Sequence, residues 1–320
     1  MKKINLLTLC VMAFFISLIQ TSCSSDDHIY ADSPEQNLNK SQISLEDKEN
    51  LLRLQTSIKA LSIPQDASSN NTGMRVPFWK KFWKAVATVF SDAVGAVIGS
   101  AIPVPGATVA GGTLTSGLVA HYIYGSDAEI KVKYGSDGFA PVHKIGTSFN
   151  NIIVNNYSDR TWKDSLGYYH NAVLYDFFKD SLAAENTYNL SQREFADAML
   201  NKANGVFPTQ LILNTQQREL LIQETITNSN LLINALKNAE SFEDFCSLVK
   251  SEQLIDDTLF DIIVEYVNGL SQLDVENDNG QYVQDVINLI NSYNLSQNTK
   301  EVLQGFVAIG QGSNHLWKEQ

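Results

Sequence analysis

The pair of side chains best suited to acid–base chemistry in this sequence is His170 followed by Asn171. An imidazole titrates close to neutral pH, so His170 could serve as a general base. His170 also follows two tyrosines and precedes an apolar helical pattern. These neighbours favour a hydrogen-bonded core or cap histidine over a catalytic base.

An acidic run near the C-terminus has the alternation of a calcium-binding loop. Asp274, Glu276 and Asp278 stand where the first ligands of such a loop would be. Asn279 takes the place of the glycine that the sharp turn needs, and Asp285 closes the run where a bidentate glutamate is expected. We interpret the run as a solvated turn, so the sequence predicts no metal site and no cofactor.

Other signs of catalysis are missing from the sequence. The 5 histidines show no metal-ligand spacing, and no zinc-protease, P-loop or nucleophile-elbow motif occurs. Cys246 lies within a helical apolar pattern, which is typical of a small core residue. We therefore expect a protein that is not an enzyme.

The N-terminal segment has the composition of a secretory signal. Lys2 and Lys3 precede an apolar stretch at 6–19, and small residues lead to Cys23. This order predicts a lipoprotein signal peptide at 1–22, removed before Cys23, whose thiol would then carry the lipid. The alternative is an ordinary signal peptide followed by a cysteine that plays no part in anchoring.

The residues after the cysteine carry a resemblance to a known group. Ser24, Ser25, Asp26, Asp27 and His28 resemble the Ser/Asp-rich tether of surface lipoproteins of Bacteroides and its relatives. The resemblance implies a protein anchored by lipid in the outer membrane and exposed at the cell surface.

Charge limits the partners of the chain. It has 23 Lys and Arg residues against 35 Asp and Glu residues, a net charge of −12, and loss of Lys2 and Lys3 makes the mature chain more acidic. A nucleic-acid surface needs a concentrated basic face, so nucleic acid is not an expected partner.

Residues 23–75 are expected to form a disordered, flexible tether and linker. They are polar, with one short helical candidate at 45–61, and 64–73 is rich in turn-forming residues. Arg75 follows directly, in the kind of segment where proteolysis concentrates.

Residues 76–125 begin with aromatic and basic side chains at helical spacing. A helix with this pattern can lie at a membrane surface, with its rings at headgroup depth and its lysines reaching water. The predicted membrane-interface anchors are Phe78, Trp79, Lys80, Lys81, Phe82, Trp83 and Lys84.

The same segment continues into a glycine-rich stretch, Ala93 to Ala120, that contains no charged residue. Small residues recur at four-residue spacing, which lets apolar helices approach closely. Two prolines and a glycine predict a turn between arms near 83–102 and 107–124. The residues expected to pack or turn this helical hairpin are Gly95, Gly99, Pro103, Pro105, Gly106, Gly111 and Gly112.

The sequence leaves the location of this hairpin open. Each arm is close to the roughly 20 residues that cross a bilayer core. Asp92 lies within the first arm, however, where an ionised carboxylate would cost about 2.5–3.5 kcal/mol. The hairpin could insert into a membrane, form the buried central pair of an α-helical domain, or drive self-assembly without insertion.

Residues 126–320 read as an α-helical domain, and the fold class expected for the whole chain is all-α. Helix boundaries are predicted from capping residues and glycines. The main predicted helices are 192–203, opened by Ser191 and closed by Gly205; a helix ending at 236, opened by Asn214 or Thr215; 242–249, opened by Ser241; 256–267, closed by Gly269; 281–293; and 299–309.

A short motif occurs twice before these helices, at Gly146 with Asn150 and at Gly167 with His170 and Asn171. The second copy resembles a Gly-x-x-His-Asn signature of uncharacterised exported proteins of Bacteroides and its relatives. That resemblance implies no activity, and the role of the motif is left open.

The order of the segments suggests two functions. A lipid tether, a linker ending at Arg75 and a small-residue hairpin resemble the layout of cell-surface pore-forming toxins of Bacteroides, which implies a membrane-active, bacteriocin-like antibacterial protein released by cleavage after Arg75. Its partners would be a target-cell membrane or receptor and an immunity protein. The alternative is a non-catalytic surface lipoprotein whose α-helical domain binds a partner or an envelope polymer.

Overall fold

The computed structural model describes residues 43, 45–62, 79–124, 166–181, 190–207, 211–272 and 279–317. Every regular element in these ranges is an α-helix, so the all-α fold predicted from the sequence is confirmed. The helices are α2 (Leu45–Ser62), α3 (Trp79–Ser100), α4 (Ala107–Tyr124), α7 (Leu166–Ser181), α8 (Gln192–Val206), α9 (Thr215–Asn238), α10 (Phe242–Ser251), α11 (Asp257–Gln272), α12 (Asn279–Ser292) and α13 (Gln297–Trp317).

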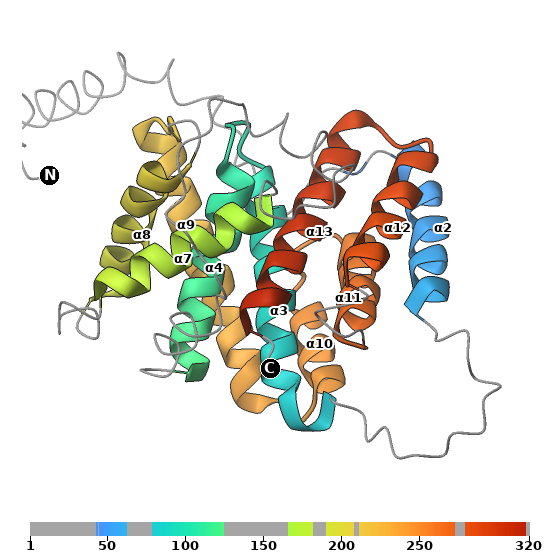
Figure 1. The fold of residues 1–320 in the computed structure, drawn as a ribbon, viewed down its shortest axis with the longest axis horizontal. Coiled ribbons are helices and arrows are strands. Elements are labelled where there is room, and N and C mark those ends of the chain that lie inside the picture. Colours follow the sequence, from blue (N-terminus) through green and yellow to red (C-terminus); the bar gives the residue numbers. More distant parts are fainter. Residues whose placement is uncertain are drawn as a thin grey trace, which may run out of the picture. The chain divides into compact units, whose positions relative to one another are not determined.

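The predicted hairpin is the central element of this helical domain (Figure 1). α3 and α4 pack along each other, and residues 101–106 reverse the chain between them. Gly106 has a φ of 87°, in the left-handed region that glycine adopts without a steric penalty. Pro103 and Pro105 lie exposed at this turn, where their missing N–H groups interrupt no helix.

Helices from most of the chain surround the hairpin. α13 packs along α3 and also contacts α7, while α7, α8 and α9 cover α4. α10 and α11 complete the cover of α3. As a result, residues 86–99 and 109–120 are buried without interruption. In this structure the hairpin therefore forms the interior of the domain, which is the second of the three locations that the sequence allowed.

None of the helices within the described ranges combines the length and the apolar character needed to cross a membrane.

α2 lies inside the segment that was expected to be tether, close to the helix predicted at 45–61. It packs against α11 and α12, and its inner side chains Leu51, Leu54 and Ile58 are fully buried. The range 23–75 therefore contains an element that belongs to the helical domain.

The predicted N-caps Ser191 and Ser241 are correct, and of the two residues predicted to open α9, Asn214 is the N-cap. The side chains of Ser191, Asn214 and Ser241 accept hydrogen bonds from backbone N–H groups in the first turns of α8, α9 and α10. Each cap satisfies a donor that the helix itself leaves without a partner, and for this reason the local sequence sufficed to find it.

The predicted C-terminal ends were too early by three residues or more at three helices. α8 continues through Gly205, α11 continues through Gly269, and α13 runs on to Trp317. Gly269 lies where an added Cβ would overlap the ring of Tyr282. Glycine in α11 therefore makes room for a neighbouring side chain rather than ending the helix, a purpose that depends on tertiary packing.

Candidate functional site

A cluster of polar side chains lies at the middle of the buried hairpin, centred on Asp92 of α3. The carboxylate is 0% exposed. Its Oδ2 atom accepts hydrogen bonds from Ser116 Oγ of α4 at 2.8 Å and from Ser313 Oγ of α13 at 2.5 Å. Trp317 Nε1 donates to Ser116 Oγ at 3.3 Å. One carboxyl group thus connects both arms of the hairpin to the C-terminal helix.

His170 of α7 completes this cluster from a fourth helix. Its Nε2 atom lies 3.6 Å from Asp92 Oδ2, and the imidazole is fully buried. Its Nδ1 atom lies 2.8 Å from Asn171 Oδ1, while Asn171 Nδ2 donates to the carbonyl of Gly312 at 2.7 Å. Because the amide nitrogen is committed to Gly312, Asn171 Oδ1 acts as the acceptor and Nδ1 of the neutral imidazole carries the proton. The lone pair of Nε2 then faces the carboxyl group.

The electrostatics of the pair favour neutral side chains. Burial raises the pKa of Asp92 well above its usual value, against the opposing effect of the hydrogen bonds from Ser313, Ser116 and Trp317. Burial also lowers the pKa of His170 to about 4, while the side chain of Asn171 and the backbone of Gly112, which favour the charged ring, oppose this shift. Desolvation disfavours each charged form. Burial therefore favours the protonated carboxyl group of Asp92 and the neutral imidazole of His170 over their charged forms.

Two polar atoms of the cluster make no hydrogen bond of normal geometry within the described residues. They are Asp92 Oδ1 and His170 Nε2. The 3.6 Å between His170 Nε2 and Asp92 Oδ2 is longer than a direct hydrogen bond. A buried polar atom without a hydrogen bond lowers the stability of a protein, so changes in this cluster should have a large effect on the free energy of unfolding.

The Gly-x-x-His-Asn motif of the sequence is explained by this arrangement. Gly167 lies where α7 meets α13, and an added Cβ there would overlap the carbonyl of Ala308 and crowd the backbone of Gly312. The close approach lets Asn171 reach the Gly312 carbonyl and brings His170 to the hairpin. The motif therefore joins α7 to α13 and to Asp92.

The predicted small-residue packing of the hairpin is present as well. An added Cβ at Gly99 would overlap the backbone of Ala107, and one at Gly111 would overlap the backbone of Gly95 and Gly99. Gly112 instead faces Ile309 of α13. The glycines bring backbones together both within the hairpin and between the hairpin and its cover, which is the packing role expected of them.

The predicted membrane-interface anchors are only partly within the described structure. Trp83 is half-buried against the core and Lys84 is exposed, with its Nζ atom 6.0 Å from the ring centroid of Trp83. Trp79, Lys80, Lys81 and Phe82 fall in the first turns of α3, but their side chains lie outside the described residues, as does Phe78. Cys23, Arg75, Gly146, Asn150, Asp274, Glu276 and Asp278 also lie outside them.

Cys246 packs against the core of the domain, and burial raises the pKa of its thiol. A thiol that resists ionisation is a poor nucleophile, which agrees with the structural role expected from the sequence.

Within the described ranges, no group of three or more metal-ligating side chains comes together.

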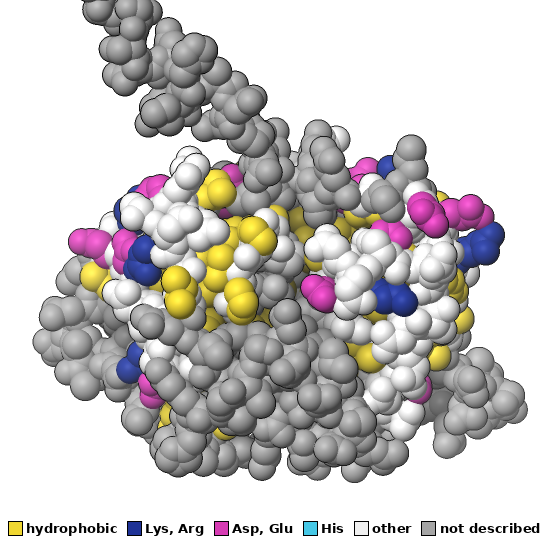
Figure 2. Space-filling view, turned by 90° about the horizontal axis from the view of Figure 1, so that it is seen from above, with side chains coloured by type: hydrophobic (Ala, Val, Ile, Leu, Met, Phe, Trp, Pro, Cys, Tyr) yellow, Lys and Arg dark blue, Asp and Glu magenta, His cyan; other side chains and the backbone are white. Residues whose placement is uncertain are grey.

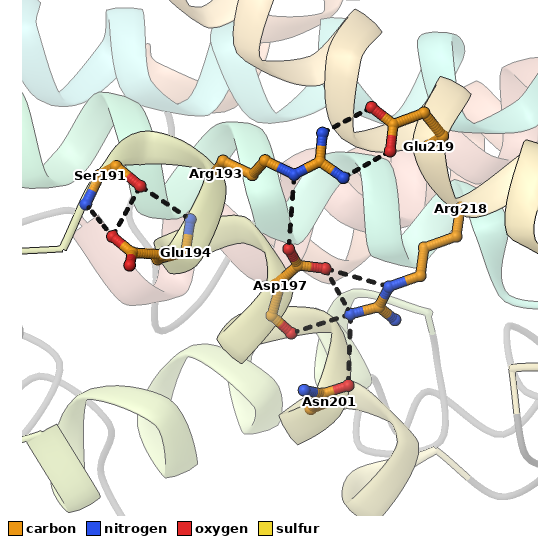
Figure 3. Close-up of polar contacts among 7 residues, drawn as sticks. All are labelled: Ser191, Arg193, Glu194, Asp197, Asn201, Arg218 and Glu219. Atoms are coloured by element: carbon orange, nitrogen blue, oxygen red, sulfur yellow. Dashed lines mark hydrogen bonds and ion pairs between the residues drawn. The ribbon is translucent and has the colours of Figure 1, made fainter.

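A second polar network lies at the surface between α8 and α9 (Figure 3). Arg193 forms an ion pair with Glu219, and Arg218 binds Asp197 at 2.7 Å. The capping pair Ser191 and Glu194 stands beside them. These groups are substantially exposed, so they orient two helices without forming an enclosed site.

Sequence reasoning missed Ser116, Ser313 and Trp317 as members of the buried cluster. The available signal was Asp92 itself, since a carboxyl group in an apolar stretch of a helix requires polar partners. Hydroxyl groups were abundant in the hairpin, but Ser313 is 221 residues away from Asp92 in the chain.

Comparisons of this chain with protein-family models, with curated proteins and with solved structures found no match.

Proposed function

We propose that this protein is a lipid-anchored surface protein whose α-helical domain binds a macromolecular partner without catalysing a reaction. The observation that carries this proposal is the complete burial of Asp92 and His170. These two side chains are the acid–base pair best suited to chemistry in the described structure. Four helices enclose them, so they act on the fold rather than on a substrate.

The burial of the hairpin supports the same proposal. Its uncharged face is in contact with α13, α7 and α9 rather than with solvent. Asp92, the residue that would oppose insertion, receives two hydroxyl hydrogen bonds inside the domain. The apolar surface and the carboxyl group of the hairpin thus find partners inside the domain, which supports a hairpin that stays within the fold.

The surface indicates the chemistry of the partner. The chain is acidic overall, with a net charge of −12, and Arg193 and Arg218 are paired with carboxylates. Apolar side chains gather among polar ones on the face shown in Figure 2. The most exposed large apolar residue of the described structure is Ile212, at 74%. A neutral or basic partner, contacted partly through apolar side chains, fits this surface.

Photo-crosslinking on intact cells tests the binding function. A benzoylphenylalanine at Ile212 or at Leu52, which are 74% and 53% exposed, should give an adduct of one discrete mass. The same probe at Glu301, an exposed polar position on α13, controls for random encounters. The absence of a discrete adduct from both apolar positions would contradict the proposal.

The lipid anchor has its own test. Labelled palmitate should enter the full-length protein and should be lost in Cys23→Ala, and surface protease should remove the wild-type protein from intact cells. Label that persists in Cys23→Ala would contradict anchoring at this cysteine.

A membrane-active toxin is the second candidate, and the packing within the hairpin favours it. α3 and α4 meet backbone to backbone through Gly99 and Gly111, so the pair could leave the domain as one unit. Release would first require α13 and α7 to separate from Asp92. Cleavage after Arg75 would be the trigger, with a target membrane or receptor and an immunity protein as partners.

Vesicle leakage separates the two candidates. The mature chain, before and after cleavage at Arg75, is added at micromolar concentration to dye-filled vesicles of phosphatidylethanolamine and phosphatidylglycerol. We expect no leakage. Dye release that depends on cleavage and is lost in Gly99→Leu would favour the toxin and would contradict a purely structural hairpin.

A further inference from the structure

α2, the first helix of the described structure, is held by the C-terminal part of the chain. α2 packs along α11 and also touches α12, at one side of the domain (Figure 1). Leu51, Leu54 and Ile58 are each 0% exposed, while Leu52 on the opposite side is 53% exposed. One apolar stripe of α2 is thus fully covered by elements that lie about two hundred residues further along the chain.

Polar contacts fix the position of α2 along this surface. Asp47, only 2% exposed, accepts hydrogen bonds from the backbone N–H and the hydroxyl of Ser296, at 2.8 and 2.6 Å, and from Thr299 Oγ1 at 2.7 Å. Ser296 precedes α13, so Asp47 places its negative charge at the N-terminus of that helix, where the helix dipole favours it.

Further contacts follow the length of α2. Asn50 Nδ2 donates to the carbonyl of Asn294 at 2.8 Å, and the hydroxyls of Ser57 and Tyr293 are 2.8 Å apart. Lys59 forms an ion pair with Glu265 of α11 at 3.2 Å. Both ends and the middle of α2 are therefore recognised by specific groups.

These contacts have the form of an amphipathic helix bound to a complementary surface of the domain. We propose that α2 is the bound ligand of the surface formed by α11, α12 and the start of α13, and that it holds the domain to the anchor after the chain is cut between α2 and α3. The inference rests on the lipid anchor proposed above for its cellular meaning. Cleavage after Arg75 would then leave a two-piece protein on the cell, and release of the domain would require a second step that displaces α2.

The contacts of α2 also indicate what would displace it. The surface that binds α2 recognises a helix with buried aliphatic side chains at the spacing of Leu51, Leu54 and Ile58 and with an acidic residue one turn earlier, like Asp47. The α2 segment of a second copy of this chain meets that description. Exchange of α2 between copies is therefore the form of displacement that the structure supports.

A cleavable full chain tests the proposal. A specific protease site replaces residues 66–72, an affinity tag precedes α2, and the protein is bound to resin through the tag and cut. The portion from α3 to α13 should stay on the resin through extended washing, and excess synthetic peptide of residues 43–62 should elute it in folded form. Folded protein that leaves the resin on cleavage alone would overturn the proposal.

A matched pair of variants shows which face of α2 holds the domain. Leu54→Asp should increase the fraction released on cleavage by at least about tenfold, which is the change expected for loss of a buried anchor. Leu52→Asp makes the same chemical change on the exposed side and should behave like the parent. Equal retention of the two variants would overturn the proposal.

The uncut variants are compared by circular dichroism and thermal unfolding. If Leu54→Asp unfolds the uncut chain, the retention of the parent and its elution by peptide decide the question. The lipid anchor plays no part in this assay, because the tag replaces it. If α2 does not retain the domain, the palmitate result is unchanged. If palmitate does not label the protein, the retention assay is unchanged.

Discussion

Asp92 Oδ2 and His170 Nε2 face each other across 3.6 Å at the centre of the domain, and neither side chain is exposed to solvent. The two residues come from different helices, α3 and α7, and from the two motifs that stood out in the sequence, the glycine-rich hairpin and Gly-x-x-His-Asn. Their contact shows that both motifs serve one packed centre. Because the pKa values of both groups are shifted by burial, their protonation should affect the stability of the fold.

Replacing Asp92 by asparagine tests whether the carboxyl group is neutral. A protonated carboxyl and an amide are similar in shape, and the amide oxygen can accept the bonds from Ser116 and Ser313. Asp92→Asn should therefore keep the free energy of unfolding at pH 7 within about 1 kcal/mol of the parent, or raise it.

Asp92→Ala is the matched control. It leaves both serine hydroxyls without an acceptor and opens a small cavity, so it should lower the free energy of unfolding by about 2–4 kcal/mol. Urea titration followed by circular dichroism measures both variants. A large loss in Asp92→Asn would mean that the carboxylate is ionised in the fold.

The pair should also give the protein a defined pH dependence. The pKa of His170 is lowered to about 4, so the unfolded chain binds a proton below about pH 6.5 that the folded protein does not. The stabilising contribution of His170 to the free energy of unfolding is therefore present above about pH 6.5 and is lost as the pH falls towards 4.

Asp92 contributes in the opposite direction. Its pKa is raised in the fold, so the unfolded chain loses a proton above about pH 4 that the folded protein retains, and stability falls as the pH rises. Between about pH 4 and 6.5 the two contributions oppose each other. Asp92→Asn removes one of them, so this variant should lose more stability than the parent on acidification from pH 7 to 4.5.

The difference between the parent and Asp92→Asn is the quantity to measure, because the surface carboxylates titrate equally in both. Urea midpoints at pH 4.5, 7 and 8.5 suffice. We expect the asparagine variant to gain stability relative to the parent at pH 8.5 and to lose that gain at pH 4.5. A difference that does not change with pH would contradict the assignment of these pKa shifts.

The local sequence was sufficient to predict most of the helices and their N-terminal ends. Ser191, Asn214 and Ser241 each act within one turn of their own helix, so their role does not depend on the rest of the fold. The turn at Gly106 was predictable for the same reason, since the conformation of the turn and the residue type that permits it lie at the same position.

The sequence could not show which segments meet. α2 was predicted as a helix, but the surface that binds it is built from residues after 257. Nothing in the sequence near Asp47 indicates Ser296 as its partner. Gly205 and Gly269 look alike as helix ends, yet both lie within helices. The location of the hairpin was also open, because the small residues that pack helices in lipid equally pack them in a protein core.

Cys246 should report on the opening of the domain. Its thiol is packed against the core and its pKa is raised, so reaction with a maleimide at pH 7.5 should be slow in the folded protein. With Cys23 replaced by serine, the rate should rise sharply in urea at the same midpoint as the change in circular dichroism. Fast labelling without urea would show that α10 opens independently of the core.

Gly167 and Gly205 form a pair that tests the packing role of the Gly-x-x-His-Asn motif. Both are glycines within a helix, but an added Cβ at Gly205 meets no atom within 4 Å, whereas one at Gly167 overlaps the Ala308 carbonyl. Gly205→Ala should raise the free energy of unfolding by up to about 1 kcal/mol, because alanine favours the helix.

Gly167→Ala should lower the free energy of unfolding by about 1–3 kcal/mol, because α7 must move away from α13. That movement also pulls His170 from Asp92 and Asn171 from the Gly312 carbonyl. The variant should therefore lose part of the pH dependence that distinguishes the parent from Asp92→Asn. A destabilised Gly167→Ala protein with unchanged pH dependence would show that the helix crossing and the buried pair are independent.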